Sequence, residues 1–572
     1  MSVTTRSPST VSLSEQAFLA SVDVWLNDHR TEFVADLLDW VSIPSVSDEE
    51  HAAQGAPFGP QVARMLDRVR ERATELGFES STHEGYAVTI LGDPAPSVND
   101  DGASPGSTPR TSDTQPALGT LTTLGNTPPA ASGTRHATPG STQQPITNSE
   151  HATTNSRHAS DTPATPTQPE IGLVSHLDVV PAGDGWTLDP YTPFEREGFV
   201  VGRGSSDNKG PAVVDLYLLR LFRDLGIPLR HRLRVIYGGS EESGMADISY
   251  YAKHGPVPGF SLVTDGPFPV NFAQKGGLNL YLHLPTGPVL KSLTGGVAIN
   301  AVPSSAQVLL GDAHPAAIRA KLAELPADIR DDLDVVAGPD GTELHARGRS
   351  GHAAFPGGTR NAVLVLARAL VEAELVRNGD LAAARFLATV LATPYGDGSG
   401  VAFEDEISGQ LTQNGGLVRP EGDGIALHID IRYPVTASSE TIRDRFRDLL
   451  APIGGSLVGY DDAPPFYINP DSPVVGILQD VFTGVSGIDS PPFAMGGGTH
   501  SRVLPNAITF GPGFAHLRNS GDDGAAPHPS FIPSGHGSPH GPDEFVWLDD
   551  LFTAFRIYAL ALLRLDKELD HE

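Results

Sequence analysis

Residues 171–178 read IGLVSHLD, an apolar run that ends in two polar side chains, His176 and Asp178. The run predicts a buried strand. Beyond it, a helical pattern covers residues 210–225, and further strands are predicted at 233–237 and 261–264. Strands that alternate with helices indicate an α/β fold with a largely parallel sheet. His176 and Asp178 therefore lie at the carboxyl end of a strand, where such folds place their functional sites.

Further acidic residues occupy similar positions along the chain. Asp207 lies in GRGSSDNKG before the predicted helix, Glu241 and Glu242 follow a strand in YGGSEESG, and Asp265 ends the strand in SLVTDG. Taken singly, a helix cap or a solvated turn explains each of them. Adjacent carboxylates repel unless a cation is near, so one glutamate can bind metal while the other acts as a general base. Their joint placement at strand ends favours a metal site.

Composition limits the kinds of partner. The 572 residues are enough for two or three domains, and the formal net charge is −30. This charge argues against a nucleic-acid partner and against an anionic membrane surface. The chain has no cysteine, so any metal must be held by His, Asp and Glu. The opening residues MSVTTRSPST lack the apolar core of a signal peptide, and no apolar run approaches a membrane span, so we expect a cytoplasmic protein.

Changes in amino-acid composition and hydrophobic pattern divide the chain into segments. Residues 94–169 are almost entirely small, polar or Pro, and predict a disordered insertion. Before it, residues 61–76 show a helical pattern that is taken to open the globular part. From 277 to 466 the acidic clusters become fewer, and residues 425–432 alternate between apolar and polar as in a half-buried strand. We expect this segment to be a second domain inserted into a first one, which comprises 1–276 and 467–572.

Four motifs in this order carry a resemblance to a known family: SHLDVVPAGDGW, GRGSSDNKG, GGSEESG and VTDG. Together they resemble the co-catalytic zinc exopeptidases, a superfamily of aminoacylases, glutamate carboxypeptidases and dipeptidases. The resemblance covers nearly all of the chain outside 94–169 and the first residues. It implies a zinc-exopeptidase-like catalytic domain with a mixed, largely parallel sheet, and an inserted α+β lid domain at 277–466.

The resemblance also implies roles for the matching residues. His176 and Asp265 would hold one metal ion, Glu242 and a late histidine would hold a second, and Asp207 would bridge the two. Asp178 would support His176, and Glu241 would be the general base.

The late histidine has two candidates. In the family it precedes the closing helix in a stretch that His540 to Phe545, HGPDEF, resembles best. His536 is the alternative, because the loop here is longer than in the family pattern. His516 and His528 in the same loop are expected to be solvated.

Matches in the second domain imply substrate contacts. His352, in HARGRSGHAAFP, resembles a lid histidine that stabilises the oxyanion. Asn300, in GGVAINAVP, resembles a lid asparagine near the same oxygen, and Arg432 resembles the arginine that pairs with the substrate carboxylate. The turn GGGT, which ends at Thr499, is expected to approach the bound peptide.

The long lid and the GGGT turn look most like the PepV-type dipeptidases. This implies a monomer that acts on dipeptides or other small peptides, with His352 acting in its own chain. Two divalent ions per chain are expected, zinc first, although manganese and cobalt also suit these ligands. An N-acyl amino acid deacylase is the alternative, because the metal ligands cannot separate the two activities. A catalytically silent binding protein is disfavoured, because Glu241 and every expected ligand are present.

Overall fold

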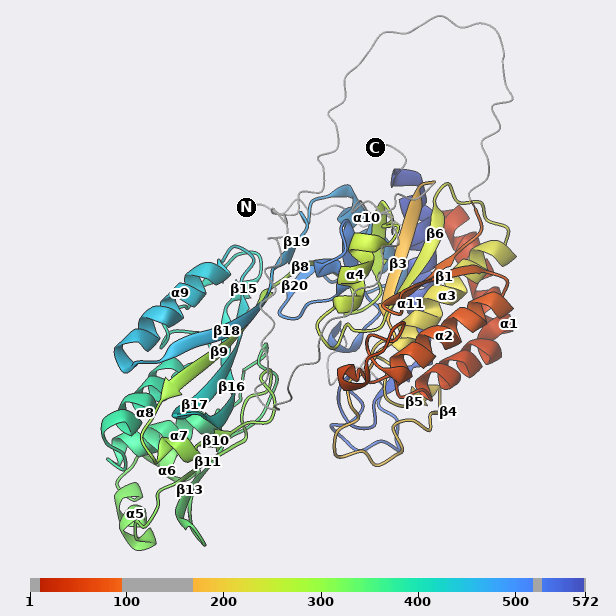
Figure 1. Ribbon diagram of the computed structural model, residues 1–572. Coiled ribbons are helices and arrows are strands. Elements are labelled where there is room, and N and C mark those ends of the chain that lie inside the picture. The colour runs from red at the N-terminus through yellow and green to blue at the C-terminus, as the bar shows by residue number, and fades with distance from the viewer. Residues whose placement is uncertain (1–10, 95–167, 518–526, 570–572) are drawn as a thin grey trace, which may run out of the picture.

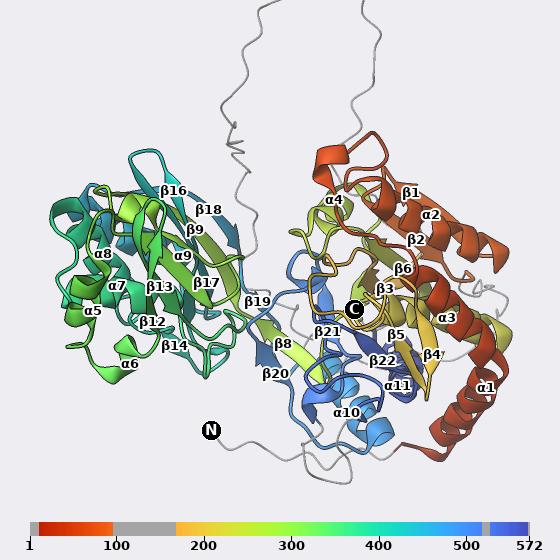
Figure 2. The same cartoon turned by 90° about the horizontal axis from the view of Figure 1, so that it is seen from below.

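The computed structural model describes residues 11–94, 168–517 and 527–569. Figures 1 and 2 show two lobes side by side, each built on its own sheet. The first lobe contains the early and late parts of the chain, and the second contains the middle part. No helix in the described ranges is both long and apolar enough to cross a membrane.

The sheet of the first lobe is mixed, as predicted. Its four central strands run parallel to one another, whereas the strands that flank this group on either side pair with it antiparallel. In spatial order the strands are β1 (Glu79–His83), β2 (Ala87–Leu91), β6 (Arg232–Gly238), β3 (Glu170–His176), β7 (Phe260–Val263), β21 (Ala507–Phe510), β8 (Val270–Gln274) and β19 (Phe466–Tyr467), with β20 (Phe493–Met495) beside β8.

Helices cover both faces of this sheet. Alternate strand residues point to opposite sides, so Leu173 joins the larger core whereas Val174 packs toward α4 (Ala246–His254). The larger core contains α1 (Leu13–Val41), α2 (Pro60–Glu75), α3 (Lys209–Asp224), α10 (Pro473–Ser486) and α11 (Leu548–Glu568). A small sheet of β22 (Phe545–Trp547), β5 (Phe199–Val201) and β4 (Phe194–Arg196) lies at the side of the lobe.

Helix α1 corrects the expectation that the globular part opens near residue 61. It spans Leu13–Val41 and is part of the core, because Val22, Phe33 and Leu37 are fully buried. It packs against α3 and α11 and also touches α2. Contacts on several sides bury residues around much of its circumference, so the sequence lacks the one-sided apolar stripe by which a surface helix is recognised.

The second lobe has an antiparallel sheet with helices on one face, the α+β arrangement expected for 277–466. Strand β17 buries Ile425, Leu427 and Ile429 completely, as its alternation predicts. The strand order is β12 (Leu333–Gly338), β13 (Gly341–Arg347), β11 (Ser305–Leu309), β10 (Thr294–Gly295), β16 (Thr412–Glu421), β17 (Gly424–Tyr433), β9 (Gly276–Pro285) and β18 (Ser456–Ala463). The helices are α5 (Pro315–Leu322), α6 (Ala327–Arg330), α7 (Ala362–Glu372), α8 (Asn378–Val390) and α9 (Ser439–Leu450), and a hairpin of β14 (Glu404–Asp405) and β15 (Gly409–Gln410) completes the lobe.

Two short connections join the lobes. Lys275 alone separates β8 from β9, and Pro464 and Pro465 separate β18 from β19. The domain boundaries at 277 and 466 stay a prediction, with which the extent of the second sheet agrees. Most of the predicted insertion at 94–169, and the first ten residues, lie outside the described residues.

Candidate metal centre

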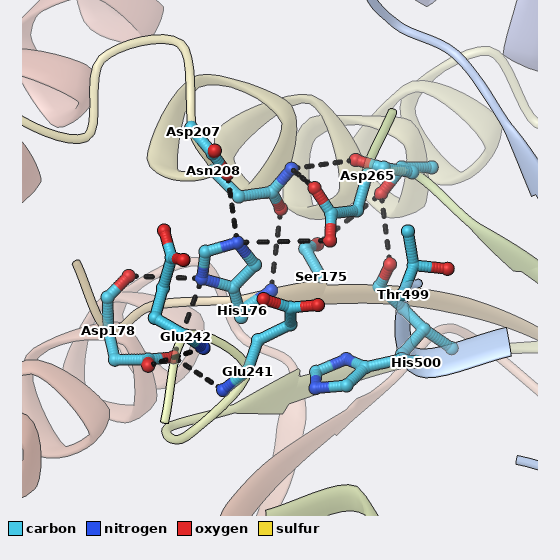
Figure 3. A network of polar contacts seen from close by, with 12 residues as sticks. Ser175, His176, Asp178, Asp207, Asn208, Glu241, Glu242, Asp265, Thr499 and His500 are labelled. Atoms are coloured by element: carbon cyan, nitrogen blue, oxygen red, sulfur yellow. Dashed lines mark hydrogen bonds and ion pairs between the residues drawn. The ribbon is translucent and has the colours of Figure 1, made fainter. Parts of the chain in front are cut away.

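The predicted residues meet at one edge of the first sheet. His176 ends β3, Glu241 and Glu242 follow β6, and Asp265 follows β7, and these three strands are parallel neighbours. Asp207 approaches the same edge from the loop before α3, which begins at Lys209. Figure 3 shows these side chains converging. Parallel strands bring their carboxyl ends to one edge, and the predicted cluster forms for that reason.

The carboxylate of Asp207 lies between two imidazoles. His176 Nε2 is 3.0 Å from Asp207 Oδ1, and His540 Nε2 is 3.1 Å from Asp207 Oδ2. His540 Nε2 also lies 2.8 Å from Glu242 Oε1, and Asp265 Oδ2 lies 3.8 Å from His176 Nε2. Each oxygen of Asp207 therefore faces a different histidine, one with Asp265 beside it and the other with Glu242.

Asp178 holds the back of this cluster. It is fully buried, and its main-chain oxygen lies 3.0 Å from His176 Nδ1. Its two carboxylate oxygens each accept one backbone N–H at 3.1 Å, from Glu241 and from Glu242. Asp178 thus orients the His176 ring through its main-chain oxygen, and its carboxylate fixes the turn that carries both glutamates (Figure 3).

The acidic side chains strongly perturb one another. Burial, reinforced by the nearby carboxylates, raises the pKa of Glu241 well above its usual range, that of Glu242 to about 7 and that of Asp265 to about 6. Burial would also raise the pKa of Asp207, but hydrogen bonds from both histidines outweigh it and hold the pKa well below its usual range. Hydrogen bonds to Asp207 and Glu242 raise the pKa of His540 to about 11. So much negative charge in one buried place calls for cations.

The donor set fits divalent metal ions. His176, Glu241 and Asp265 have ligand atoms within 4.8 Å of one another, and so do His176, Asp207 and Glu242. Imidazole nitrogen and carboxylate oxygen are ligands that suit zinc, manganese and cobalt. The first group shows that Glu241 also lies within reach of a bound ion, so distance alone does not separate a base from a ligand there.

The loop that carries Asp207 is fixed by a residue that the sequence analysis missed. Glu544 is fully buried, and its Oε1 accepts the backbone N–H groups of Ser206 and Asp207, both at 3.0 Å. Its Oε2 accepts from Arg203 Nη1 at 2.6 Å and from the N–H of Gly204 at 3.0 Å. Glu544 lies within the HGPDEF stretch, so its position close to the predicted ligand His540 could have identified it from the sequence.

Asn208 was missed as well. Its Oδ1 accepts the backbone N–H of His176 at 3.3 Å, and its Nδ2 donates to Asp265 Oδ1 at 3.2 Å and to the carbonyl of Thr264 at 2.9 Å. Asn208 therefore ties the ends of β3 and β7 to the loop of Asp207. The sequence feature that could have identified Asn208 is its position directly after Asp207.

The late histidines separate by their partners. His540 lies against Asp207 and Glu242, whereas His536 Nδ1 lies 2.7 Å from Asp543 Oδ2 and is engaged away from the cluster. His528 lies beside the carbonyl of His536, and His516 packs near Phe493. Of the four, only His540 lies against the predicted ligands.

The predicted lid residues are paired with each other. Asn300 and His352 come together because the N–H of Ala353 donates to the carbonyl of Asn300 at 2.9 Å. The N–H of Ala354 donates to His352 Nδ1 at 3.1 Å, so the ring proton stands on Nε2. Ala354 also meets the first lobe, because its Cβ lies 3.2 Å from where a Cβ on Gly496 would be.

The two remaining predicted substrate contacts are already engaged within the protein. Arg432 donates from Nε and Nη2 to the carboxylate of Asp430, at 2.9 and 2.7 Å. The hydroxyl of Thr499 lies in a buried network with Gln274, Ser501 and Thr509. The N–H of Thr499 donates to Gln274 Oε1, which leaves the residue without a free donor for a substrate.

Comparisons with known proteins agree with the motifs. The profile of peptidase family M20/M25/M40 matches residues 172–564. The Bacillus subtilis protein named "Putative dipeptidase YtjP" is 34% identical over 411 residues, which cover 69% of this chain and 83% of the relative. The Beta-Ala-Xaa dipeptidase of Lactobacillus delbrueckii subsp. lactis is 27% identical, covering 70% and 82%. A solved structure of the dipeptidase Dug1p from Saccharomyces cerevisiae aligns at 13% identity with a TM-score of 0.48, covering 96% of this chain and 98% of that one.

Proposed function

The chain belongs to peptidase family M20/M25/M40, and we propose that it is a metal-dependent dipeptidase that hydrolyses short unblocked peptides. The observation that carries the proposal is the carboxylate of Asp207, whose two oxygens face His176 and His540. A carboxylate placed in this way would be a ligand for both cations of a two-metal site. The names of the relatives support the peptide substrate.

In this proposal His176 and Asp265 would hold one ion, Glu242 and His540 would hold the other, and Asp207 would be a ligand of both. When bound, the two cations lower the pKa of a water and polarise the scissile carbonyl. Zinc is the expected metal, with manganese and cobalt as alternatives that this donor set also suits. The cytoplasmic location expected from the sequence stays a prediction.

The side chains of the protein then move the protons. Glu241 removes a proton from the attacking water and delivers it to the leaving amine. We assign it this role, and not that of a ligand, because Glu242 is the neighbour that lies against His540. Asp178 acts indirectly, by fixing the His176 ring and the turn that carries Glu241.

His352 is proposed to stabilise the oxyanion. Since Nδ1 accepts the N–H of Ala354, Nε2 carries the proton that can be donated. The surrounding protein and the Arg432 guanidinium lower the pKa of His352, so the ring is neutral at neutral pH. Asn300, exposed and paired to the same loop, is proposed as a second contact to this oxygen. The loop contacts the first lobe of its own chain at Gly496, which supports the proposal that the protein acts as a monomer.

The experiment is a comparison of substrates on the full chain, with zinc or manganese restored after chelation. Unblocked dipeptides and N-acyl amino acids are assayed with the wild-type protein and with Glu241→Ala. We expect metal-dependent cleavage of dipeptides, and a kcat lowered roughly 10²- to 10⁴-fold in the variant, as for loss of a general base. Metal content measured in the variant separates loss of the base from loss of an ion.

Other results change the proposal in defined ways. Cleavage of acylated amino acids alone would replace the dipeptidase by an N-acyl amino acid deacylase that uses the same residues. No hydrolysis with metal bound would indicate a silent binding protein, and the role of Glu241 would then be withdrawn.

A further inference from the structure

Asp247 is a buried carboxylate that is not one of the predicted metal ligands. It lies in the first turn of α4 and is fully buried, as is Ser240. Its Oδ2 accepts the backbone N–H of Ser240 at 2.9 Å, and its Oδ1 accepts that of Ile248 at 2.7 Å. Ser240 directly precedes Glu241, so Asp247 holds the start of the turn that carries the proposed base.

Two carboxylates together hold this turn. Asp178 accepts the N–H groups of both glutamates and Asp247 accepts that of Ser240, so three consecutive N–H groups have an acceptor. Asp178 also orients His176 through its main-chain oxygen. Among the described residues, the carboxylate of Asp247 contacts no predicted metal ligand, because its partners are two backbone N–H groups and one histidine outside that set. Asp247 can therefore be changed while every predicted ligand stays in place.

The side-chain partner of Asp247 is His500, which comes from a distant part of the chain. His500 opens the short helix η4 (His500–Arg502) after the GGGT turn, and it is fully buried. Its Nε2 lies 3.2 Å from Asp247 Oδ2. Burial would raise the pKa of Asp247, but the charge and the hydrogen bond of His500, with the two backbone N–H groups, outweigh it and hold the pKa below its usual range. Asp247 is therefore a carboxylate, and His500 donates to it through Nε2.

The end of β6 leaves space for this pair. A Cβ at Gly238, the last residue of that strand, would overlap with Asp247 Oδ2 and lie 2.7 Å from His500 Cε1. A side chain at this position would push the pair away from the turn. The ring of His500 stands edge-on to that of His176, with the ring centroids 6.4 Å apart (Figure 3). The pair therefore packs against the strand ends that carry the metal centre.

The pair is not what stability alone would favour. His500 Nδ1 is buried and has no hydrogen-bond partner in the part of the chain that the structure describes. A buried polar atom without a partner costs free energy, and an apolar side chain at this position would avoid that cost. The imidazole instead supplies a fixed N–H donor to the carboxylate that holds the turn of Glu241.

We propose that Asp247 and His500 are positioning residues that hold Glu241 where it can take the proton of the attacking water. This inference rests on the proposed function and adds two residues that act through the base. A displacement of about 1 Å can cost on the order of 10²-fold in rate, so the loss of this support should be visible in kcat.

The test measures kcat, KM and metal content on the full chain, with metal restored and an unblocked dipeptide as substrate. Asp247→Ala removes the acceptor, whereas Asp247→Asn keeps an oxygen that can accept from Ser240. The matched control is Asp566→Ala. Asp566 accepts the backbone N–H groups of Arg230 and His231 and lies 3.1 Å from the His231 ring, directly before β6, at the opposite end of that strand from Gly238.

Asp247→Ala is expected to lower kcat roughly 10- to 100-fold with KM and metal content unchanged, because only the base is displaced. Asp247→Asn recovers part of this loss. Asp566→Ala keeps the wild-type kcat, although it breaks a comparable buried pair. In the background of Glu241→Ala, Asp247→Ala causes little further loss, because a residue that acts through the base then has nothing to position.

His500→Phe tests the pair from its other side and carries the test if Asp247→Ala does not fold. It fills the space of the ring but removes the N–H donor. We expect kcat to fall in this variant as well, and we expect the fall to disappear in the background of Glu241→Ala.

Three results would overturn the inference while the peptidase function stands. These are an unchanged kcat in the folded variants of Asp247 and His500, an equal loss of kcat in Asp566→Ala, and a loss that adds in full to that of Glu241→Ala. The last would show that the pair acts on the fold or on the metal ligands. If the wild-type protein hydrolyses neither dipeptides nor N-acyl amino acids, the proposed function itself fails and the inference falls with it.

Discussion

The residues around the candidate metal centre are of two kinds: those whose side chains point into it, and those that hold these side chains in position. Glu544 belongs to the second kind, because it accepts hydrogen bonds from the loop of Asp207 and pairs with Arg203. Both side chains of that pair are almost completely buried. Removal of the carboxylate would leave a buried guanidinium unpaired and release the loop at the same time.

Glu544→Gln is therefore expected to have two effects. The free energy of unfolding falls by about 3–5 kcal/mol, as for one broken buried ion pair. The affinity for zinc or manganese falls roughly 10- to 100-fold, because the support of Asp207 is lost. Denaturant unfolding and calorimetric metal titration measure the two effects separately.

The matched control is Glu170→Gln. Glu170 forms a comparable buried pair with Arg234, at the opposite end of β3 from His176. It should lose stability without losing metal affinity. Equal metal affinities in the two variants would show that Glu544 has no part in positioning Asp207.

Among the secondary-structure elements, the start of α1 is fastened to α11. Ser12 caps the helix, and Glu15 pairs with Arg564 through two hydrogen bonds at 2.8 and 3.1 Å. The hydrogen bond from Arg564 lowers the pKa of Glu15 from 4.5 to about 2. Because the folded pKa lies below the unfolded one, the carboxylate stabilises the fold fully above about pH 4.5 and loses this effect as the pH falls toward 2.

Glu15→Gln is expected to lower the free energy of unfolding at pH 7 by about 1 kcal/mol, a modest value because solvent screens the pair. The difference from the wild-type protein should narrow as the pH drops below 4.5. Urea unfolding between pH 7 and pH 3.5 measures it, with the exposed Glu50→Gln as the control. A difference that stays constant across this range would contradict the assignment.

Among the helices and strands, some features could be predicted from the sequence and others could not. Strand ends and helix starts carry a local signal, and this signal correctly brought His176, Asp207, Glu242 and Asp265 to one sheet edge. The fully packed helix α1 gave no one-sided pattern. Glu544 and Arg203 meet across 341 residues, so only the fold reveals this contact.

In the whole molecule, the chain leaves the sheet of the first lobe and returns to it at two places, between β2 and β3 and between β8 and β19. The end of β2 and the start of β3 both pair with the same end of β6, near Arg232 and Arg234. The chain therefore leaves the sheet after β2 and returns two strands away, about 10 Å from where it left. The segment between them can vary in length without any change in β2, β6 or β3, and the metal centre lies at the other end of these strands.

The whole second lobe is inserted between β8 and β19. This lobe carries His352, so its position relative to the first lobe bears on which chain's site His352 serves. Its loop touches Gly496 of the same chain, and Arg432 and His540 both influence its pKa. The proposal that the protein acts as a monomer therefore predicts that the site is complete within one chain. A partner subunit is then not needed to supply the lid histidine.

Mixing two inactive variants tests this directly. Glu241→Ala keeps the lid histidine, and His352→Ala keeps the base, so each has what the other lacks. If His352 acts in its own chain, co-expressing or co-refolding the two restores no dipeptide hydrolysis above that of the separate variants. If a partner supplied the histidine, random pairing in a symmetric dimer would restore about a quarter of the wild-type sites. Recovery near that level would reject the single-chain site. It would also mean that the lid loop moves away from Gly496, because His352 cannot reach a partner's site while its loop packs against Gly496 of its own chain.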